Sequence, residues 1–467
     1  MSGLASAARP GPLMEFVHRR RRGAELFLLV LSLVVGLGAY AAVGIGLDGE
    51  VPADIIGYGG WLAALVIGCH VVIRLCAEYA DPILLPVVSA LNGLGLAMIY
   101  RLDQSGAVGT GSNASKQLVW MTIGVLLFVA VLVVLRDHRR LQAFTYTSGL
   151  AALVLLVLPL LPGIGQNING ARIWIRVGSM SFQPGELAKV LLVITFAGYL
   201  VQHRDALALA GRRVLFVDLP RGRDLGPIVA MWLVSLGVLV FQNDLGSSLL
   251  FFGIFLVMLY VATERPGWLI VGAVLFAVGA WLGYLTTPHV RVRVQAWLDP
   301  FSHDSAYQIV QGMYGMAWGG LVGRGLGEGH PSMTPYSYSD FILPSFGEEL
   351  GLTGVMAILL LYGLLVERAL RTALICRDNF GKLVAVGLAT VFALQVFVVV
   401  GGVTKLIPLT GLTTPFLSYG GSSLVANWVI IALLLRVSDQ ARRPPPELDA
   451  GTEESDATQI VSLRGLR

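Results

Sequence analysis

The sequence predicts an all-α polytopic membrane protein with about twelve transmembrane helices, on the basis of three observations. Of its 467 residues, 55% are hydrophobic and only 13% are charged, whereas a soluble domain has roughly 45–50% apolar and 25% charged residues. Apolar runs of about 20 residues, the length that crosses a bilayer, recur along the whole chain. The 56 glycines suit membrane helices that approach each other closely. A soluble globular protein is excluded, because so few polar side chains cannot cover its surface.

The individual spans follow from a window of about 19 residues moved along the chain. The seventh and eighth spans meet at a short polar sequence, Gln242 to Asp244. The predicted spans cover residues 24–45, 55–77, 82–100, 116–135, 143–162, 185–202, 226–242, 246–262, 268–286, 349–367, 382–402 and 419–437.

The net charge of +4 lies mostly in arginines of short loops, so it indicates orientation rather than a nucleic-acid partner. Arginine clusters, beginning with Arg19 to Arg22, alternate with loops that are poor in positive charge, which predicts that both termini are cytoplasmic. We therefore divide the chain into a cytoplasmic basic tail (1–23), a membrane domain (24–437) and a disordered cytoplasmic tail (438–467).

The three cysteines show no metal-ligand spacing, and we interpret them as packing residues.

One connection is much longer than the others, a large extracytoplasmic loop of about residues 286–348 between the ninth and tenth spans. Long loops in compact proteins are usually functional or disordered. This one contains too many aromatic residues for disorder, among them Trp297, Tyr307 and Trp318. We expect it to fold against the outer face of the membrane.

Ionisable residues within apolar spans point to function, because each is costly at the bilayer centre. Glu186 and Lys189 are three residues apart and follow Gln183–Pro184, where proline suits the first turn of a helix. They are either a structural ion pair or the charged lining of an internal cavity.

Further polar candidates lie at the outer boundary of the membrane. Asp244 is either a substrate-binding carboxylate or an exposed turn residue. Arg172 and Arg176 lie four apart in residues 169–178, which fit an interfacial helix or a strand-like loop. Because arginines are uncommon on the outer side, they favour an anionic ligand.

The large loop combines arginines with carboxylates, which are the charge clamp and the base that a phosphate-linked substrate needs. No phosphate-binding Walker motif, zinc-protease helix or Gly-x-Ser-x-Gly sequence is present, so ATP hydrolysis and proteolysis lose support. The charged candidates in and beside this loop are Arg291, Arg293, Asp299, Asp304, Asp340, Glu348 and Glu349.

Several segments together resemble the SEDS family, the RodA and FtsW type of peptidoglycan glycosyltransferase, and most closely its actinobacterial RodA-type arrangement with two extra N-terminal spans. The most specific is PLTGLTTPFLSYGGSSL, at 408–424. The others are NGARIWI at 169–175, FQPGELAK at 182–189, QNDLGSSLLF at 242–251, DFI at 340–342, GEELGL at 347–352 and GLGLAMIYRLD at 93–103.

The resemblance implies an inverting enzyme that polymerises lipid II outside the bacterial cytoplasmic membrane, in elongation or division, with a class B penicillin-binding protein as partner. The intramembrane Glu and Lys of the family fall on Glu186 and Lys189. Its essential loop Asp usually stands three residues after a Pro; here His303 takes that place, so the role passes to Asp304, with Asp299 as the fallback. The expected substrate-binding residues are Arg172, Glu186, Lys189, Asp244, Arg291, Arg293, Asp340, Ser418 and Tyr419.

The reaction needs a base for the acceptor hydroxyl and positive charge on the pyrophosphate leaving group. One carboxylate together with arginines or a divalent cation, Mg²⁺ or Mn²⁺, would supply both. A covalent double displacement would need a second carboxylate about 5 Å away, and nothing in the sequence specifies one. No other cofactor is expected.

Two other functions fit the same composition. Twelve spans with buried charges and broken helices are also typical of secondary transporters, so a flippase for a lipid-linked precursor is one alternative. The absence of an obvious repeat between the halves, and the position of the polar residues at the outer face, argue against it. The other alternative is a noncatalytic scaffold for cell-wall enzymes.

Overall fold

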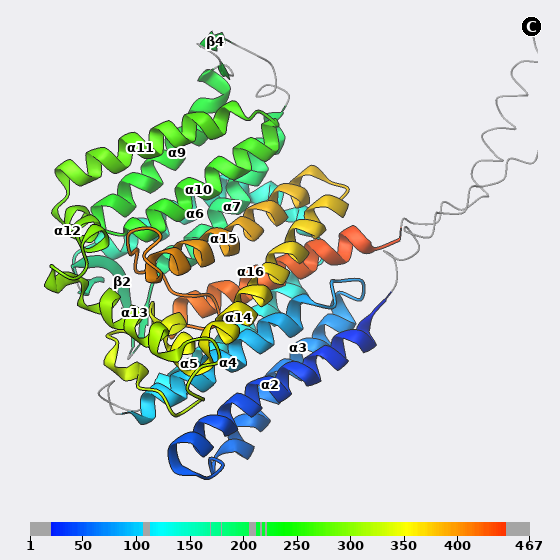
Figure 1. Ribbon diagram of the computed structural model, residues 1–467. Coiled ribbons are helices and arrows are strands. Elements are labelled where there is room, and N and C mark those ends of the chain that lie inside the picture. Colours follow the sequence, from blue (N-terminus) through cyan, green and yellow to red (C-terminus); the bar gives the residue numbers. More distant parts are fainter. Residues whose placement is uncertain are drawn as a thin grey trace, which may run out of the picture.

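The computed structural model describes residues 20–105, 113–168, 170–178, 180–204, 212–214, 217–219 and 222–444. It confirms the predicted all-α polytopic architecture: long helices lie side by side, with α2 and α11 toward opposite edges of the bundle (Figure 1). The α-helices are α2 Arg22–Asp48, α3 Ile55–Cys76, α4 Leu84–Gln104, α5 Asn113–Val134, α6 Thr145–Val157, α7 Pro184–Gln202, α9 Gly222–Phe241, α10 Leu245–Thr263, α11 Gly267–Thr286, α12 Pro288–Leu298, α13 Tyr307–Gly319, α14 Ile342–Ile375, α15 Asn379–Val403 and α16 Gly421–Arg442.

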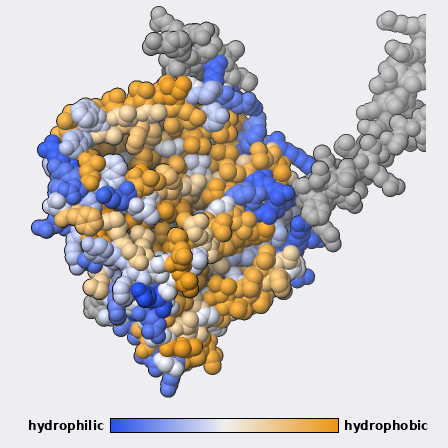
Figure 2. Space-filling model, in the orientation of Figure 1, coloured by the Kyte–Doolittle hydropathy of each residue, from blue (hydrophilic) through white to orange (hydrophobic). Residues whose placement is uncertain are grey.

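Each of the twelve expected spans coincides with a helix. Within the described ranges, eleven helical stretches are long and apolar enough to cross a membrane, and the apolar part of α9, Gly226–Phe241, is shorter. The number of crossings therefore stays a prediction. Figure 2 shows a largely hydrophobic surface along the sides of the helices, with hydrophilic residues gathered mainly toward their ends, as a bilayer-embedded bundle requires.

Four helices form the centre of the bundle. In α4, α7, α15 and α16, 78–89% of the span is buried, compared with 6% in α11. Since lipid tails are as apolar as leucine, close packing rather than hydrophobicity fixes such helices. Where α2 crosses α4, a Cβ atom on Gly93 would lie 2.9 Å from the Cα of Gly36, so both positions require glycine for this approach.

The expected large loop contains ordered structure. Between α11 and α14 lie α12, α13 and two 3-10 turns, η3 Asp304–Ala306 and η4 Pro331–Met333. We call the end of the bundle that carries residues 287–341 the loop end. The N-terminal helices reach it too, because a Cβ atom on Gly46, near the end of α2, would lie 2.1 Å from the Leu326 carbonyl oxygen.

Helix α14 begins at Ile342, before the predicted span 349–367, and is interrupted at Gly351, whose φ is 69°. The residues after this break bond to the loop rather than to the preceding turn: Leu352 N–H donates to Gly320 O and Thr353 N–H to Leu321 O. Hydrogen bonds to the loop thus fix the break, and the span prediction missed residues 342–348 because a hydropathy window responds only to long apolar runs.

Residues around the predicted outer arginines form a strand, which decides the alternative that the sequence left open. Strands β1 Gly165–Ile168, β2 Ala171–Val177 and β3 Met180–Phe182 pair antiparallel in that order. Arg172 and Arg176 share one exposed face of β2, as side chains four apart do in a strand. Asn169, the first residue of the quoted motif, lies outside the described residues. The remaining short elements are β4 Arg212–Val214, β5 Val217–Leu219, η1 His138–Phe144 and η2 Leu158–Leu160.

The C-terminal helix continues past the predicted tail boundary at 438, to Arg442. Ion pairs hold this last turn: Arg442 pairs with Asp81, and Arg436 lies 3.6 Å from Asp439. Residues 1–19 and 445–467, which make up most of both predicted tails, lie outside the described residues.

Candidate active site

The segment that joins α15 to α16, residues 404–420, is irregular backbone at the loop end, and we call it the connector. Side chains from other elements satisfy its backbone groups. Gln117 of α5 donates to Ser418 O (3.0 Å) and accepts from Gly420 N–H (3.3 Å). The Ser418 hydroxyl accepts from Thr414 N–H (2.8 Å) and donates to Ser339 O (2.5 Å). Non-helical backbone within a membrane bundle is tolerated where protein encloses it or where it lines a cavity.

Glu186 and Lys189 form a buried ion pair beneath the connector. They lie on the first two turns of α7, which begins at Pro184 as expected. Lys189 Nζ lies 2.5 Å from Glu186 Oε2 and donates to Gln395 Oε1 of α15 (3.0 Å). Gln395 in turn donates to Thr413 O of the connector (2.8 Å). The pair is therefore linked through one amide to the irregular backbone.

Asp244 caps the N-terminus of α10, where its carboxylate accepts from Ser247 N–H (2.9 Å). It is half-buried, and burial raises its pKa; Glu186 raises it further, while Ser247 and Arg293 oppose the shift. The structure thus brings Asp244 within electrostatic reach of the ion pair on one side and of α12 on the other.

Arg293 connects the large loop to the connector. From α12 its Nη1 donates to Leu409 O (3.1 Å) and Thr410 O (2.8 Å). Burial lowers its pKa, whereas Asp244 and Asp340 raise it. Because both hydrogen bonds use Nη1, the Nε and Nη2 hydrogens have no hydrogen-bond acceptor among the described residues and can meet an anionic ligand.

Asp340, just before α14, is the second carboxylate near Arg293. Burial raises its pKa to about 6, against the opposing effects of its own backbone N–H, Arg293 and Gln308. A carboxyl group with a pKa this close to neutral, beside a charged partner, is typical of functional sites.

Tyrosines close the site next to Asp340. The rings of Tyr338 and Tyr419 meet edge to face with centroids 5.9 Å apart, and Tyr419 N–H donates to Tyr338 O (2.8 Å). Burial raises the pKa of both phenols, so they stay protonated at neutral pH and can donate hydrogen bonds.

The two predicted catalytic carboxylates lie on the loop after α12, and neither side chain forms a hydrogen bond or ion pair with the residues gathered around the connector, among the described residues. Asp299 follows the last residue of α12 and Asp304 opens η3; both are exposed. His303 lies between them, with Nδ1 2.8 Å from Asp299 O. These carboxylates are accessible from solvent and stand on the chain segment that continues from Arg293.

Two predicted binding residues do not join this group. Arg172 is exposed, and only its backbone N–H bonds to Gln242 O (3.3 Å). Arg291 donates to Leu285 O (2.9 Å) and lies over the Tyr284 ring, so it caps the end of α11. The residues brought together around the connector are Glu186, Lys189, Asp244, Arg293, Asp340, Ser418 and Tyr419.

The sequence did not single out the amides that tie the site together. Gln117, Gln308 and Gln395 each contact the connector or a candidate site residue from an element distant in the chain. A polar amide within an apolar run, as at Gln395, is the signal that could have marked them.

The sequence analysis also did not relate Arg101 to Glu349, which form a buried ion pair. Arg101 of α4 lies 2.8 Å from Glu349 of α14, and Arg101 Nη2 donates to Gly329 O (2.7 Å). Gly327 N–H donates to the other Glu349 oxygen (3.1 Å). These bonds hold the glycine-rich part of the loop against the bundle.

A preformed cation site is not evident beside the catalytic candidates. In the described ranges, the only trio of His, Cys, Asp or Glu groups close enough to share an ion is His138, Cys376 and Asp378. There His138 Nε2 lies 2.9 Å from Asp378, which also caps α15 through Gly381 N–H (2.6 Å). The cluster joins η1 to the turn between α14 and α15, so it serves as a structural connection.

Comparison with known proteins agrees with the resemblance in the sequence. The family described as cell cycle protein, FtsW/RodA/SpoVE, matches residues 82–443. Peptidoglycan glycosyltransferase RodA of Mycobacterium tuberculosis is 48% identical over 447 residues, 93% of this chain and 95% of that protein. RodA of Mycobacterium leprae is 49% identical over 430 residues, 91% and 92% of the two chains.

Solved structures show the same fold. One, described as "Structural coordination of polymerization and crosslinking by a peptidoglycan synthase complex", matches with a TM-score of 0.62 and 31% identity, covering 78% of this chain and 98% of that chain. The rod shape determining protein RodA of Thermus thermophilus matches with a TM-score of 0.55 and 28% identity, over 78% and 98%. The sequence, the fold and the site thus lead to one conclusion: this chain belongs to the FtsW/RodA/SpoVE family.

Proposed function

We propose that this chain polymerises lipid II into glycan strands on the outer face of the bacterial cytoplasmic membrane. The peptidoglycan glycosyltransferase activity itself follows from family membership and from relatives of that name at 48–49% identity over more than nine-tenths of the chain. The substrate and the direction of the chain in the membrane are the parts that we propose.

One observation carries the proposal: a bundle of membrane helices gathers cationic, anionic and hydroxyl groups around irregular backbone at one end. Lys189 and Arg293 supply positive charge, and Asp244 and Asp340 supply negative charge. Such a preorganised polar site is suited to a reaction in which a charged pyrophosphate leaves a lipid-linked sugar.

In the mechanism, exposed Asp304 is the general base. It accepts the proton of the acceptor sugar hydroxyl as that oxygen forms a bond to the anomeric carbon of the donor. The bond from this carbon to the lipid pyrophosphate breaks, the leaving group takes the electron pair, and the configuration inverts. The Nε and Nη2 hydrogens of Arg293 hydrogen-bond to the pyrophosphate oxygens as their charge develops. Asp299 is the fallback for the base.

A divalent cation, Mg²⁺ or Mn²⁺, is another possible source of positive charge for the pyrophosphate. Asp299 and Asp304 are the carboxylates that could contact it, but in the described ranges they belong to no trio of His, Cys, Asp or Glu groups close enough to share an ion. The proposed step therefore uses arginine alone, and polymerisation that persists in EDTA would support this choice.

A class B penicillin-binding protein is the proposed partner, because the strands need crosslinking and one matching structure is described as a peptidoglycan synthase complex. Both termini are proposed to be cytoplasmic, which would place the loop end outside, where the substrate and the partner's crosslinking reaction would meet.

The deciding experiment incubates the purified full-length chain with fluorescent lipid II, with and without a cognate class B penicillin-binding protein. The expected product is a ladder of glycan strands. No polymer in either reaction would contradict the proposal. Movement of lipid II across the membrane of proteoliposomes without polymer would favour the flippase. If the chain shows neither activity but its removal stops cell growth, the scaffold would be favoured.

A further inference from the structure

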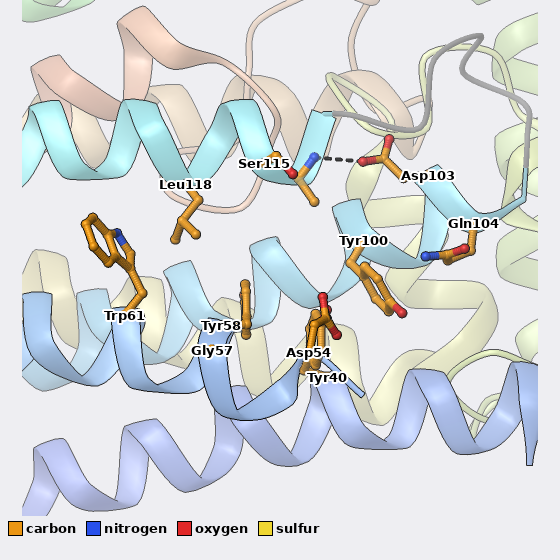
Figure 3. A pocket seen from close by; sticks show the side chains of 11 residues that line it. Tyr40, Asp54, Gly57, Tyr58, Trp61, Tyr100, Asp103, Gln104, Ser115 and Leu118 are labelled. Carbon is orange, nitrogen blue, oxygen red and sulfur yellow. Dashed lines mark hydrogen bonds between the residues drawn. The ribbon is translucent and has the colours of Figure 1, made fainter. Parts of the chain in front are cut away.

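A second polar site is a cavity of about 480 Å³ at the loop ends of α2, α3, α4 and α5 (Figure 3). One of its lining residues, Asp103, is electrostatically coupled to Tyr419 of the connector. Its walls come in part from α2 and α3, which precede the family match at residue 82. None of its lining residues belongs to the candidate active site.

Three stacked tyrosines form one wall of the cavity. The Tyr40 ring lies between those of Tyr58 and Tyr100, with centroids 4.2 Å and 4.3 Å apart. The Tyr58 hydroxyl is buried and has no hydrogen-bond partner among the described residues. The three rings add a rigid aromatic surface with polar hydroxyl groups to this side of the cavity.

Two carboxylates stand on either side of the stack. Tyr40 Oη lies 3.0 and 2.9 Å from the two oxygens of Asp54, to which it donates. Asp103 accepts from Ala114 N–H of α5 (2.7 Å). No Lys, Arg or His lines the cavity in the part of the chain that the structure describes. Asp54 is exposed and Asp103 is half-buried, so a cation that enters the cavity would meet two carboxylates and no positive side chain in the lining.

The opposite part of the cavity is apolar. Trp61 and Leu118 line it, and α5 continues beyond them with exposed side chains, Val119 and Leu126. Lys116 is exposed and electrostatically coupled to Asp103. The cavity thus combines three features. It has carboxylates with one lysine nearby, it has aromatic rings, and its apolar part continues into the exposed surface of α5.

We propose that this cavity binds a phospholipid with an ammonium headgroup. The ammonium lies between Asp54 and Asp103, the phosphate meets Lys116, and the acyl chains pass Trp61 and Leu118 and follow the exposed apolar side chains of α5. A lipid fits better than the basic side chain of a partner protein, because such a side chain would leave the apolar part of the cavity uncovered.

The test compares two lipids that differ in the headgroup cation. Detergent-purified full-length chain is mixed with dioleoyl phosphatidylethanolamine or dioleoyl phosphatidylglycerol, and retained lipid is measured by native mass spectrometry alongside thermal unfolding. We expect retention of the ethanolamine lipid to exceed that of the glycerol lipid by about tenfold, as a charge-assisted hydrogen bond predicts. The preference should disappear in the Asp54→Asn, Asp103→Asn double variant.

The matched control is Asp48→Asn, Glu50→Gln, which removes two exposed carboxylates at the same end of the bundle, outside the cavity; it should keep the preference. Equal retention of both lipids by the unmutated chain would overturn the proposal, whether or not the variants fold. A preference that survives in the Asp54, Asp103 double variant would do the same. So would a photo-crosslinker at Ser115 that captures a protein instead of lipid in cells.

Discussion

Lys189 Nζ lies 2.5 Å from the carboxylate of Glu186, and both side chains are buried beneath the connector. Removing one partner leaves a buried charge without compensation, at a cost of about 3–5 kcal/mol, whereas removing both can be nearly neutral. We expect Glu186→Gln and Lys189→Met each to destabilise the protein and the double variant to recover folding, as measured by thermal unfolding in detergent.

Activity separates the two interpretations of this pair. If the charges serve only structure, the double variant also recovers lipid II polymerisation. If they act on the substrate or the connector, it folds but stays inactive, which is the result that we expect. Polymerisation at the parent rate would remove both residues from the site.

Asp304→Ala should reduce polymerisation by about 10²–10⁴-fold, the usual contribution of a general base. The side chain is exposed, so its removal opens no core cavity and should leave thermal unfolding unchanged. Asp299→Ala, at the other end of the same short turn, is the control and should have the smaller effect. Parent rates in both variants would refute the assignment of the base.

Asp340 should make stability depend on pH. Its pKa rises from 3.8 to about 6 on folding, so the folded state binds the proton more tightly and loses stability as pH rises from about 4 to 6. Asp340→Asn has no charge to bury, and we expect it to be more stable than the parent by about 1–3 kcal/mol at pH 8. This difference should vanish near pH 4; unfolding curves at both pH values measure it, and a constant difference would contradict the shift.

Glu349→Gln should loosen the glycine-rich part of the loop. It leaves buried Arg101 without its anionic partner, at a cost of about 3–5 kcal/mol, and weakens the acceptor of Gly327 N–H. Hydrogen exchange over residues 320–330 should accelerate. The matched control is Glu367→Gln on the same helix, whose half-exposed ion pairs with Arg368 and Arg371 should contribute less than about 1 kcal/mol. Equal exchange in both variants would show that the buried pair does not hold the loop.

The sequence by itself determined the membrane class and the approximate place of each helix, because hydropathy and helix-start residues such as Pro184 act within one or two turns of the chain. It also supplied the charged candidates, since ionisable groups in apolar runs stand out without any neighbour in view. The local alternation around Arg172 fitted both a strand and a helix, and pairing with β1 and β3 decided it.

Only the tertiary structure decided which candidates meet. Lys189 and Gln395 are 206 positions apart, and Arg101 and Glu349 are 248 apart; no local pattern relates them. The same holds for the break in α14 at Gly351, after which loop carbonyls accept the bonds of Leu352 and Thr353, and for the stack of Tyr58, Tyr40 and Tyr100. The physical reason is that hydropathy records what each residue gains from the bilayer, whereas hydrogen bonds and ion pairs depend on which helices pack together.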